Sequence, residues 1–200
     1  MKRKYVLPVM ATAAAAVAGL LMACGHNTTA DGQRITKDSL IKRGNYLVTA
    51  MGCNDCHTPK VMTPTGPAPD TGRLLSGHRA DVQLPPANTD ALKNGWALFY
   101  AEGTAMISPM GTSYAANITS DETGIGNWTL EQFKTALTKG KWKGMENSRD
   151  LLPPMPWENY RNLSNADVEA IFTYLKSTKP VNNLVPAPQM AYNDTKPDKP

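Results

Sequence analysis

One five-residue motif constrains this chain more than any other feature, because its spacing suits a single kind of covalent attachment. Residues 53–57 read Cys-Asn-Asp-Cys-His, and two thiols at this spacing can both reach the vinyl groups on one edge of a porphyrin. The next residue then lies under the ring, where His57 can offer a ring nitrogen to iron. We therefore predict one haem c per chain, attached to Cys53 and Cys56, with His57 as an axial ligand.

Three other interpretations of the paired thiols fit the sequence less well. A thioredoxin-like Cys-x-x-Cys follows a strand, whereas the residues before Cys53 have helical periodicity. A structural zinc site needs about four ligands, and the chain holds only three cysteines, with no second pair. A simple disulfide would suit an exported protein, but it leaves His57 unexplained.

The first 23 residues have the layout of a signal peptide. Lys2, Arg3 and Lys4 precede an alanine-rich apolar run that ends near Ala23. A transmembrane anchor is the alternative, which Pro8 and the alanines disfavour. The segment carries three of the 21 basic residues and none of the 17 acidic ones, so the rest of the chain has a net charge of only +1. We therefore predict no nucleic-acid partner.

The end of this segment, Leu-Met-Ala-Cys at 21–24, resembles the lipobox of bacterial lipoproteins. The resemblance implies that Cys24 is lipidated and becomes the new N-terminus; an ordinary signal peptide followed by a chance cysteine is the alternative. Several acyl chains anchor a protein far more firmly than one chain does. We expect an extracytoplasmic, periplasmic protein anchored to a bacterial membrane through Cys24, with residues 24–37 as a flexible tether.

Three segments after the tether show helical periodicity. The first covers about 38–51 and contains Gly44, which is costly inside a helix unless another helix makes a close contact there. The second covers about 129–140, opening with a capping box and closing with a glycine. The third runs from Ser164 to shortly before Pro180.

The remaining segments show little periodicity. Residues 58–114 are dense in proline and glycine, apart from an apolar run at 96–100 that fits a strand or a buried loop anchor. A stretch of this length often has a function, and around a haem it would cover the edges of the ring. Residues 181–200 are rich in proline, so we expect an extended or disordered tail. The compact domain is therefore predicted at 38–180.

This order of elements resembles the class I c-type cytochromes. It is most similar to the exported monohaem cytochromes and to the single-haem domains of cytochrome subunits serving membrane-bound dehydrogenases. The matching motifs are Arg-Gly-Asn-Tyr-Leu at 43–47, Asn-Ile-Thr-Ser-Asp-Glu-Thr-Gly-Ile-Gly-Asn-Trp at 117–128, and Leu-Pro-Pro-Met-Pro-Trp at 152–157. The resemblance implies an all-α class I cytochrome c fold, with helices packed around one covalent haem and long Pro/Gly-rich loops.

The third motif suggests the second axial ligand. Met155 lies between prolines, which stiffen its loop and lower the entropy cost of holding a thioether on iron. A His57/Met155 pair suits electron transfer and raises the reduction potential relative to two histidines. Met145 and Met110 are the alternative thioethers, and His78 is the alternative for bis-histidine ligation.

Other residues are candidates for the surroundings of the haem. Trp128 and Trp157 flank the second and third motifs, and we expect them either to line the haem pocket or to pack as plain core. Arg73 and Arg79 could neutralise haem propionates or could equally be solvated. Residues 117–121 carry oxygens but lack the acidic spacing of a calcium loop, so no metal is predicted there.

The resemblance implies an electron carrier rather than an enzyme. A dehydrogenase or a quinol-oxidising complex would donate electrons, and another cytochrome or an oxidase would accept them. A second expectation is a cytochrome subunit fixed in one dehydrogenase complex. A third is a haem enzyme or sensor with an open sixth position, peroxidase-like or gas-binding. The sequence contains no Rossmann fingerprint or other catalytic motif.

Overall fold

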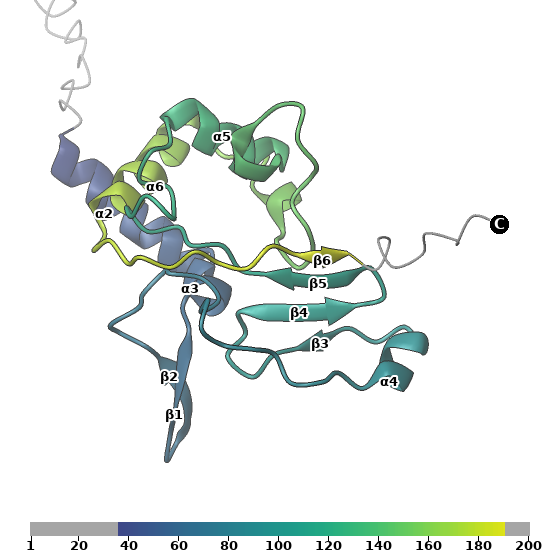
Figure 1. Ribbon diagram of the computed structural model, residues 1–200. Coiled ribbons are helices and arrows are strands. Elements are labelled where there is room, and N and C mark those ends of the chain that lie inside the picture. Colours follow the sequence, from purple (N-terminus) through teal and green to yellow (C-terminus); the bar gives the residue numbers. More distant parts are fainter. Residues whose placement is uncertain (1–35, 191–200) are drawn as a thin grey trace, which may run out of the picture. The chain divides into compact units, whose positions relative to one another are not determined.

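The computed structural model describes residues 36–190, which form helices together with antiparallel sheets (Figure 1). The helices are α2 (Lys37–Ala50), α3 (Cys53–His57), α4 (Thr89–Lys93), α5 (Leu130–Lys139) and α6 (Asn165–Ser177), with the 3₁₀ helices η1 (Trp142–Gly144) and η2 (Trp157–Asn159). The strands are β1 (Lys60–Thr63), β2 (Gly66–Pro69), β3 (Leu98–Phe99), β4 (Ala105–Ser108), β5 (Gly111–Tyr114) and β6 (Gln189–Met190). The predicted all-α fold is therefore wrong.

Helices α2 and α6 make the close contact expected at Gly44. A Cβ atom at this position would collide with the backbone carbonyl of Ala170 and would lie 2.6 Å from the Cβ of Tyr174. Next to it, Nε of Arg43 lies 2.9 Å from a carboxylate oxygen of Asp167 across the two helices. The glycine is therefore explained by helix packing, as the sequence predicted.

The ends of the helices follow local sequence signals. Thr36 caps α2 and Thr129 caps α5, each through a reciprocal capping box. Gly140 closes α5 in the left-handed conformation (φ 66°), and the hydroxyl of Ser164 caps α6. The predicted helix boundaries are confirmed, except that α2 is shifted by one residue, to Lys37–Ala50.

One apolar cluster joins these helices. Its buried members come from α2, α5 and α6 and from two loops: Leu47, Val48, Leu75, Ile125, Phe133, Leu137, Val168, Ile171 and Leu175. Burying such side chains is the main favourable contribution to folding, about 1.5–3 kcal/mol for each large one. This cluster is the core on which the candidate site rests.

Residues 58–114 supply most of the strands that the sequence prediction missed. Strands β1 and β2 form an antiparallel hairpin, and a four-stranded antiparallel sheet has the order β3-β4-β5-β6. Each strand has four residues or fewer, which is too short to show a clear alternation. Strand β2 also contains Pro67 and Pro69, which a sequence-based assignment places outside strands.

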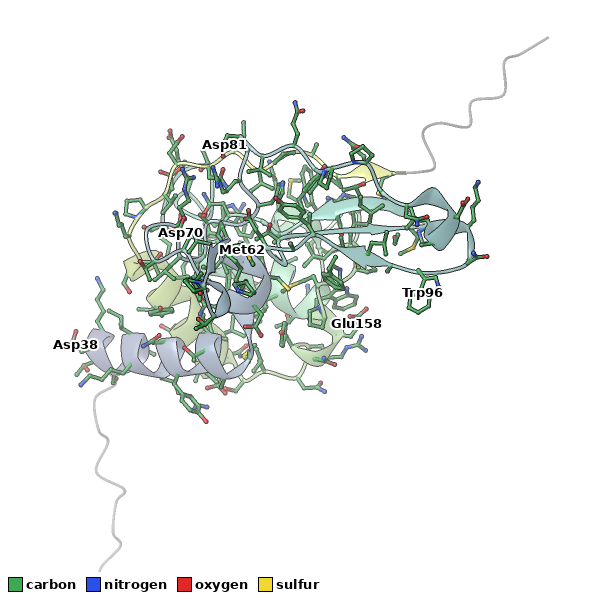
Figure 2. All side chains as sticks on the ribbon, turned by 90° about the horizontal axis from the view of Figure 1, so that it is seen from below. Asp38, Met62, Asp70, Asp81, Trp96 and Glu158 are labelled. Carbon is green, nitrogen blue, oxygen red and sulfur yellow. The ribbon has the colours of Figure 1, made fainter. Side chains whose placement is uncertain are left out.

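Residues 58–114, which we call the inserted region, carry exposed apolar side chains (Figure 2). Met62 in β1 is 75% exposed and Trp96 before β3 is 66% exposed. The apolar run at 96–100 was predicted to form either a strand or a buried loop anchor. It contributes strand β3, and Trp96 and Phe99 are exposed.

Residues 181–190, which we call the C-terminal strap, are attached to the fold. Asn183 is buried, and its side-chain amide donates hydrogen bonds to the carbonyls of Ser76 (2.7 Å) and His78 (2.9 Å). Its side-chain oxygen accepts from the backbone N–H of Ala80 at 2.9 Å. The strap ends in β6, which pairs with β5.

Several predictions fall outside the described residues 36–190. They concern the signal peptide at 1–23, the lipidation site Cys24, the tether up to residue 35 and the tail from residue 191. Within the described part, no helix combines the length and the apolar character needed to cross a membrane.

Candidate haem-binding site

The Cys-x-x-Cys-His motif forms the short helix α3. The chain enters this helix through Gly52, whose φ of 69° is a left-handed conformation that glycine adopts without strain. Residues three apart in a helix lie on the same face, so Cys53 and Cys56 point the same way. Both are half-buried free thiols. The local geometry therefore suits attachment to one edge of a porphyrin.

The electrostatics of the two thiols separate this motif from a redox-active cysteine pair. Burial raises the pKa of Cys53 to about 11, and burial also raises the pKa of Cys56. Cysteines that perform thiol–disulfide exchange have a lowered pKa, because the thiolate is the nucleophile. These thiols are instead protonated at neutral pH, which disfavours the thioredoxin-like interpretation.

The imidazole of His57 is oriented by a backbone carbonyl. Its Nδ1 lies 2.7 Å from the carbonyl oxygen of Ala116, and a carbonyl can only accept, so Nδ1 carries the proton. Burial lowers the pKa of His57, while this hydrogen bond acts in the opposite direction. The ring is therefore neutral, and Nε2 is the nitrogen left for a metal.

Gly77 makes this orientation possible. A Cβ atom at Gly77 would lie 2.5 Å from the carbonyl carbon of Ala116, and the φ of Gly77 is +77°. The backbone N–H of Gly77 also donates to the carbonyl of His57 at 2.8 Å. Gly77 thus touches both residues of the His57–Ala116 hydrogen bond. Gly77 is not predictable from the sequence, because one glycine in a Pro/Gly-rich segment carries no distinguishing signal.

Met155 and the cysteine motif both contact the apolar cluster. Met155 is half-buried and packs against the apolar cluster, as Cys53 does. Tyr160, just beyond η2, has its hydroxyl 3.4 Å from the carbonyl of Met51. Burial raises the pKa of Tyr160, and the neighbouring Cys53 and Cys56, once ionised at high pH, act in the same direction. Tyr160, shortly after Met155, therefore lies beside the haem motif, and the role of Met155 as ligand stays a prediction.

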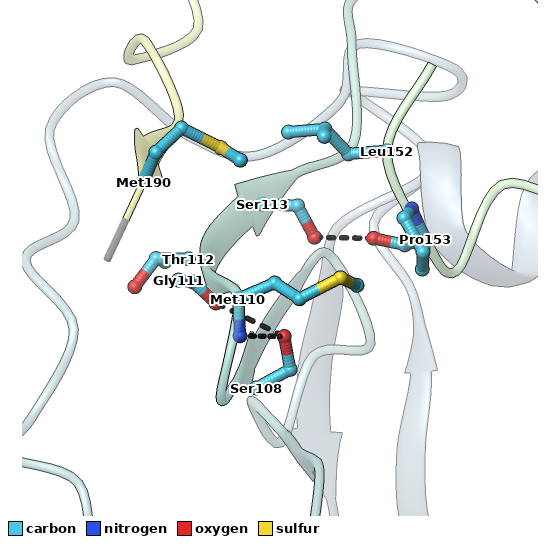
Figure 3. A pocket seen from close by; sticks show the side chains of 8 residues that line it. All are labelled: Ser108, Met110, Gly111, Thr112, Ser113, Leu152, Pro153 and Met190. Carbon is cyan, nitrogen blue, oxygen red and sulfur yellow. Dashed lines mark hydrogen bonds between the residues drawn. The ribbon is translucent and has the colours of Figure 1, made fainter. Parts of the chain in front are cut away.

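The loop that carries Met155, residues 152–157, also contacts the four-stranded sheet β3–β6, which we call the inserted sheet. The hydroxyl of Ser113 in β5 donates to the carbonyl of Pro153 at 2.6 Å. Figure 3 shows this contact in a small pocket where the β4–β5 turn, β6 and the loop before Met155 meet. The pocket is lined by Ser108, Met110, Gly111, Thr112, Ser113, Leu152, Pro153 and Met190.

The alternative axial ligands lie in different surroundings. The side chains of Met145 and Met110 are 46% and 53% exposed. His78 is fully buried, with Nδ1 2.9 Å from the hydroxyl of Thr104 and its ring beside Tyr114. Its surroundings belong to the inserted region rather than to the apolar cluster. Of these candidates, Met155 is the one that packs against the cluster with Cys53.

The two candidate tryptophans have different neighbours. Trp128 is half-buried and packs against the apolar cluster, as Met155 does. The ring of Trp157 lies so close to Gly140 that a Cβ atom there would overlap it, and the guanidinium of Arg161 stands 5.3 Å from the ring centroid. Trp157 therefore packs on the end of α5, and a place in a haem pocket stays a prediction for both.

The two candidate arginines each face an acidic neighbour in sequence. Arg73 lies 3.9 Å from a carboxylate oxygen of Asp70, and Arg79 lies 2.7 Å from one of Asp81. Exposed ion pairs of this kind are weak and leave both groups accessible to other partners.

Residues 117–121 use their oxygens inside the fold. The carboxylate of Asp121 accepts from the N–H and the hydroxyl of Thr123, while the amide of Asn117 donates to Thr123 and to the carbonyl of Val181. The segment is therefore a hydrogen-bonded turn that ties the C-terminal strap to the residues carrying Ala116.

Comparison with known proteins finds relatives that are cytochrome subunits of dehydrogenases. No family model matches it. It is 33% identical over 195 residues to the fructose dehydrogenase cytochrome subunit of Gluconobacter japonicus, a match that covers 94% of this chain and 32% of that protein. It is 32% identical over 157 residues to the cytochrome c subunit of the quinone alcohol dehydrogenase of Gluconobacter oxydans, covering 78% and 25%.

A third relative agrees with these two. The chain is 30% identical over 138 residues to the gluconate 2-dehydrogenase cytochrome c subunit of Pantoea cypripedii, covering 68% of this chain and 23% of that protein. The chain thus spans a third or less of the length of each of these curated relatives. The resemblance to cytochrome c subunits of dehydrogenases is confirmed, and the relatives imply haem c as the cofactor.

The residues of this chain fit that group. Two protonated thiols lie on one helical face, a neutral imidazole is oriented with Nε2 free, and a thioether loop packs on the same core. Cys53, Cys56, His57 and Met155 are the residues that would hold it.

Proposed function

We propose that this chain transfers electrons through one haem c, bound covalently by Cys53 and Cys56 and ligated axially by His57 and Met155. The observation that carries this proposal is the hydrogen bond from Nδ1 of His57 to the Ala116 carbonyl, which orients the imidazole for ligation. When bound, the haem supplies a one-electron redox centre. The chain itself carries out no bond chemistry.

The residues around the site serve this function by limiting rearrangement. The apolar cluster packs against Cys53 and Met155, which keeps water away and lowers the local dielectric. Prolines on both sides of Met155 restrict its loop. A His/Met pair held in this way favours a six-coordinate iron whose ligands stay in place when its charge changes.

The Met155 assignment has a direct spectroscopic test. Met155→Ala should abolish the Met–iron charge-transfer absorption of the oxidised holoprotein. Met145→Ala should retain it, because Met145 is exposed and does not pack against the apolar cluster. A wild-type protein without this band, or a Met155→Ala variant that keeps it, would contradict the assignment. A high-spin spectrum with rapid carbon monoxide binding would favour an enzyme or sensor with an open sixth position.

For its partners, we propose a dehydrogenase or a quinol-oxidising complex as electron donor and another cytochrome or an oxidase as acceptor. The relatives named as cytochrome subunits of fructose, alcohol and gluconate dehydrogenases support this. They also favour a second candidate, a cytochrome subunit fixed in one dehydrogenase complex. Purification from detergent-solubilised membranes separates the two, because a fixed subunit copurifies with its dehydrogenase and a carrier does not.

We further propose that the protein lies outside the cytoplasm, in the periplasm, anchored to a bacterial membrane by lipidated Cys24. The layout of residues 1–24 supports this location. In cells fed labelled palmitate, the wild-type chain should incorporate label and sediment with membranes. Cys24→Ser should lose the label, and a variant that keeps it would refute lipidation at this residue.

A further inference from the structure

Residues 113–116, which begin in strand β5, contact the segments that carry the two proposed axial ligands. The hydroxyl of Ser113 in this strand donates to the carbonyl of Pro153, which lies shortly before Met155. Three residues after Ser113, the carbonyl of Ala116 accepts the Nδ1 proton of His57. Residues 113–116 therefore make hydrogen bonds both to His57 and to the loop that carries Met155.

The strand that carries Ser113 is paired on both edges. Strand β5 pairs along its whole length with β4, where Met106 lies opposite Ser113, and on its other edge with β6, where Met190 lies opposite Gly111. Beyond the strand, Ala115 is bonded to Thr104 and to His78 through its backbone. Ser113 thus sits on an interior strand that cannot shift without breaking these ladders.

The backbone hydrogen bonds around Met155 are short-range, while packing of Met155 on the apolar cluster and of Trp157 on α5 supports the other side of this loop. The N–H of Met155 donates to the carbonyl of Leu152 at 3.2 Å, and the N–H of Trp157 donates to the carbonyl of Met155 at 3.0 Å. Such short-range turns fix the shape of a loop but not its position relative to a distant element. The bond from Ser113 joins residues 40 apart in sequence and anchors the loop to the sheet (Figure 3).

We propose that Ser113 is a positioning residue for the sixth iron ligand: its hydrogen bond to the Pro153 carbonyl holds the Met155 loop at the distance from the His57 side that β5 sets. This inference rests on the His57/Met155 ligation proposed above. In this role the inserted sheet would hold the loop of Met155 in place, and a bound haem would supply the redox chemistry.

The consequence is measurable as competition for the sixth position. Without the hydroxyl of Ser113, the loop moves more freely, the thioether leaves the iron more often, and an added ligand can take its place. Loss of one such hydrogen bond should raise the affinity of the oxidised holoprotein for imidazole about fivefold to tenfold. The reduction potential should fall, because a thioether ligand favours the reduced state.

The experiment titrates oxidised full-length holoprotein with imidazole and follows the Met–iron band in wild type, Ser113→Ala and Ser177→Ala. Ser177→Ala is the matched control, because the hydroxyl of Ser177 also donates to a backbone carbonyl at 2.6 Å, that of Tyr174 in α6. A second pair, Ser113→Thr and Ser113→Val, keeps or removes the hydroxyl in side chains of the same shape. This pair decides the question if Ser113→Ala gives little holoprotein.

We expect tighter imidazole binding in Ser113→Ala and Ser113→Val, with Ser113→Thr within about twofold of wild type and Ser177→Ala unchanged. Equal affinities in the Thr and Val variants, or an equal increase in Ser177→Ala, would overturn the role of Ser113. These outcomes are distinct from failure of the ligand assignment, in which wild type itself has no Met–iron band.

Discussion

The helical part of the molecule and the inserted sheet are stabilised by different kinds of contact. Helices α2, α5 and α6 form from local signals, a capping residue at each start and an apolar stripe along each face. Strands β3–β6 form from pairings between segments that carry little individual signal. Secondary structure can therefore be predicted from local sequence in the helical part, whereas the strands of the inserted sheet can hardly be predicted in this way.

Two glycines show the difference most clearly. Gly44 and Gly77 both allow a close backbone approach, against Ala170 and Ala116 respectively. Gly44 interrupts a periodic helix, where its cost demands an explanation. Gly77 lies in a segment already dense in glycine, so its importance appears only when Ala116 is seen beside it.

The first prediction tests whether the helical part depends on the close contact between α2 and α6 at Gly44. Gly44→Ala forces a Cβ atom into the Ala170 carbonyl, so α2 and α6 must separate. We expect the free energy of unfolding of the holoprotein to fall by about 3 kcal/mol or more, measured by urea denaturation. The control is Gly72→Ala, where the nearest atom is a movable carboxylate oxygen of Asp70 at 3.3 Å. Equal losses in the two variants would contradict the packing argument.

The second prediction tests the inserted region through the C-terminal strap. Asn183→Ala leaves the Ser76 and His78 carbonyls and the Ala80 N–H without their partner. We expect a loss of about 2–3 kcal/mol in the free energy of unfolding, because these groups are desolvated.

The neighbouring Asn182 provides the control for the strap. It is exposed and has one long contact, 3.4 Å to Asp121, so Asn182→Ala should cost less than about 0.5 kcal/mol. If both asparagines prove equally tolerant of alanine, the strap does not stabilise the inserted region.

The third prediction tests whether the capping residue Thr129 stabilises the start of α5. Thr129→Ala removes the hydroxyl that accepts from the N–H of Gln132 at the start of α5. We expect a loss of about 1 kcal/mol in thermal or urea denaturation. Thr49→Ala, at an exposed position of α2, should change stability by no more than about 0.5 kcal/mol. A neutral Thr129→Ala would show that tertiary packing alone holds α5.

The smallest effect concerns the ion pair between α2 and α6. A hydrogen bond from the Arg43 guanidinium holds the pKa of Asp167 below its usual value, with Ser164 contributing. A carboxyl with a lowered pKa stabilises the fold above its unfolded-state pKa of about 3.9 and loses this contribution as the pH falls through the folded-state pKa. Asp167→Asn should therefore cost about 0.5–1 kcal/mol at pH 7.

The pH dependence checks this assignment. The stability difference between wild type and Asp167→Asn should shrink as the pH is lowered below about 4, followed by urea denaturation at each pH. Glu169→Gln removes a negative charge from an exposed position of the same helix and serves as control. A difference that stays constant down to pH 3 would mean that the charge of Asp167 is not what stabilises the helix pair.

The predictable part of the fold was the part with local order. The capping box at Thr129, the closing Gly140 and the contact at Gly44 were all expected and are present. The all-α prediction failed because strands of two to four residues leave no periodic trace, and β2 even contains prolines. The register of such strands depends on partners that a linear pattern does not identify.

The candidate site divides in the same way. Cys53, Cys56 and His57 follow from a contiguous motif, and Met155 follows from a short proline-flanked one. The residues that orient them were not predicted, because the His57–Ala116 bond spans 59 positions and a serine hydroxyl in a strand looks like any other. Reactive residues that are close together in sequence can be predicted from a motif. The residues that position them come from distant parts of the chain and cannot be predicted in this way.

The long reach of these supporting contacts bears on the order in which the molecule assembles. The Arg43–Asp167 pair closes a loop of 124 positions, and the bond from Asn183 to Ser76 closes one of 107. A chain made from its N-terminus presents the thiols of α3 well before the residues that later pack around them have been synthesised. Contacts of such separation are slow to form, so we expect the cysteines to be reachable for haem attachment during a distinct early period, which the arrival of α6 and the strap brings to an end.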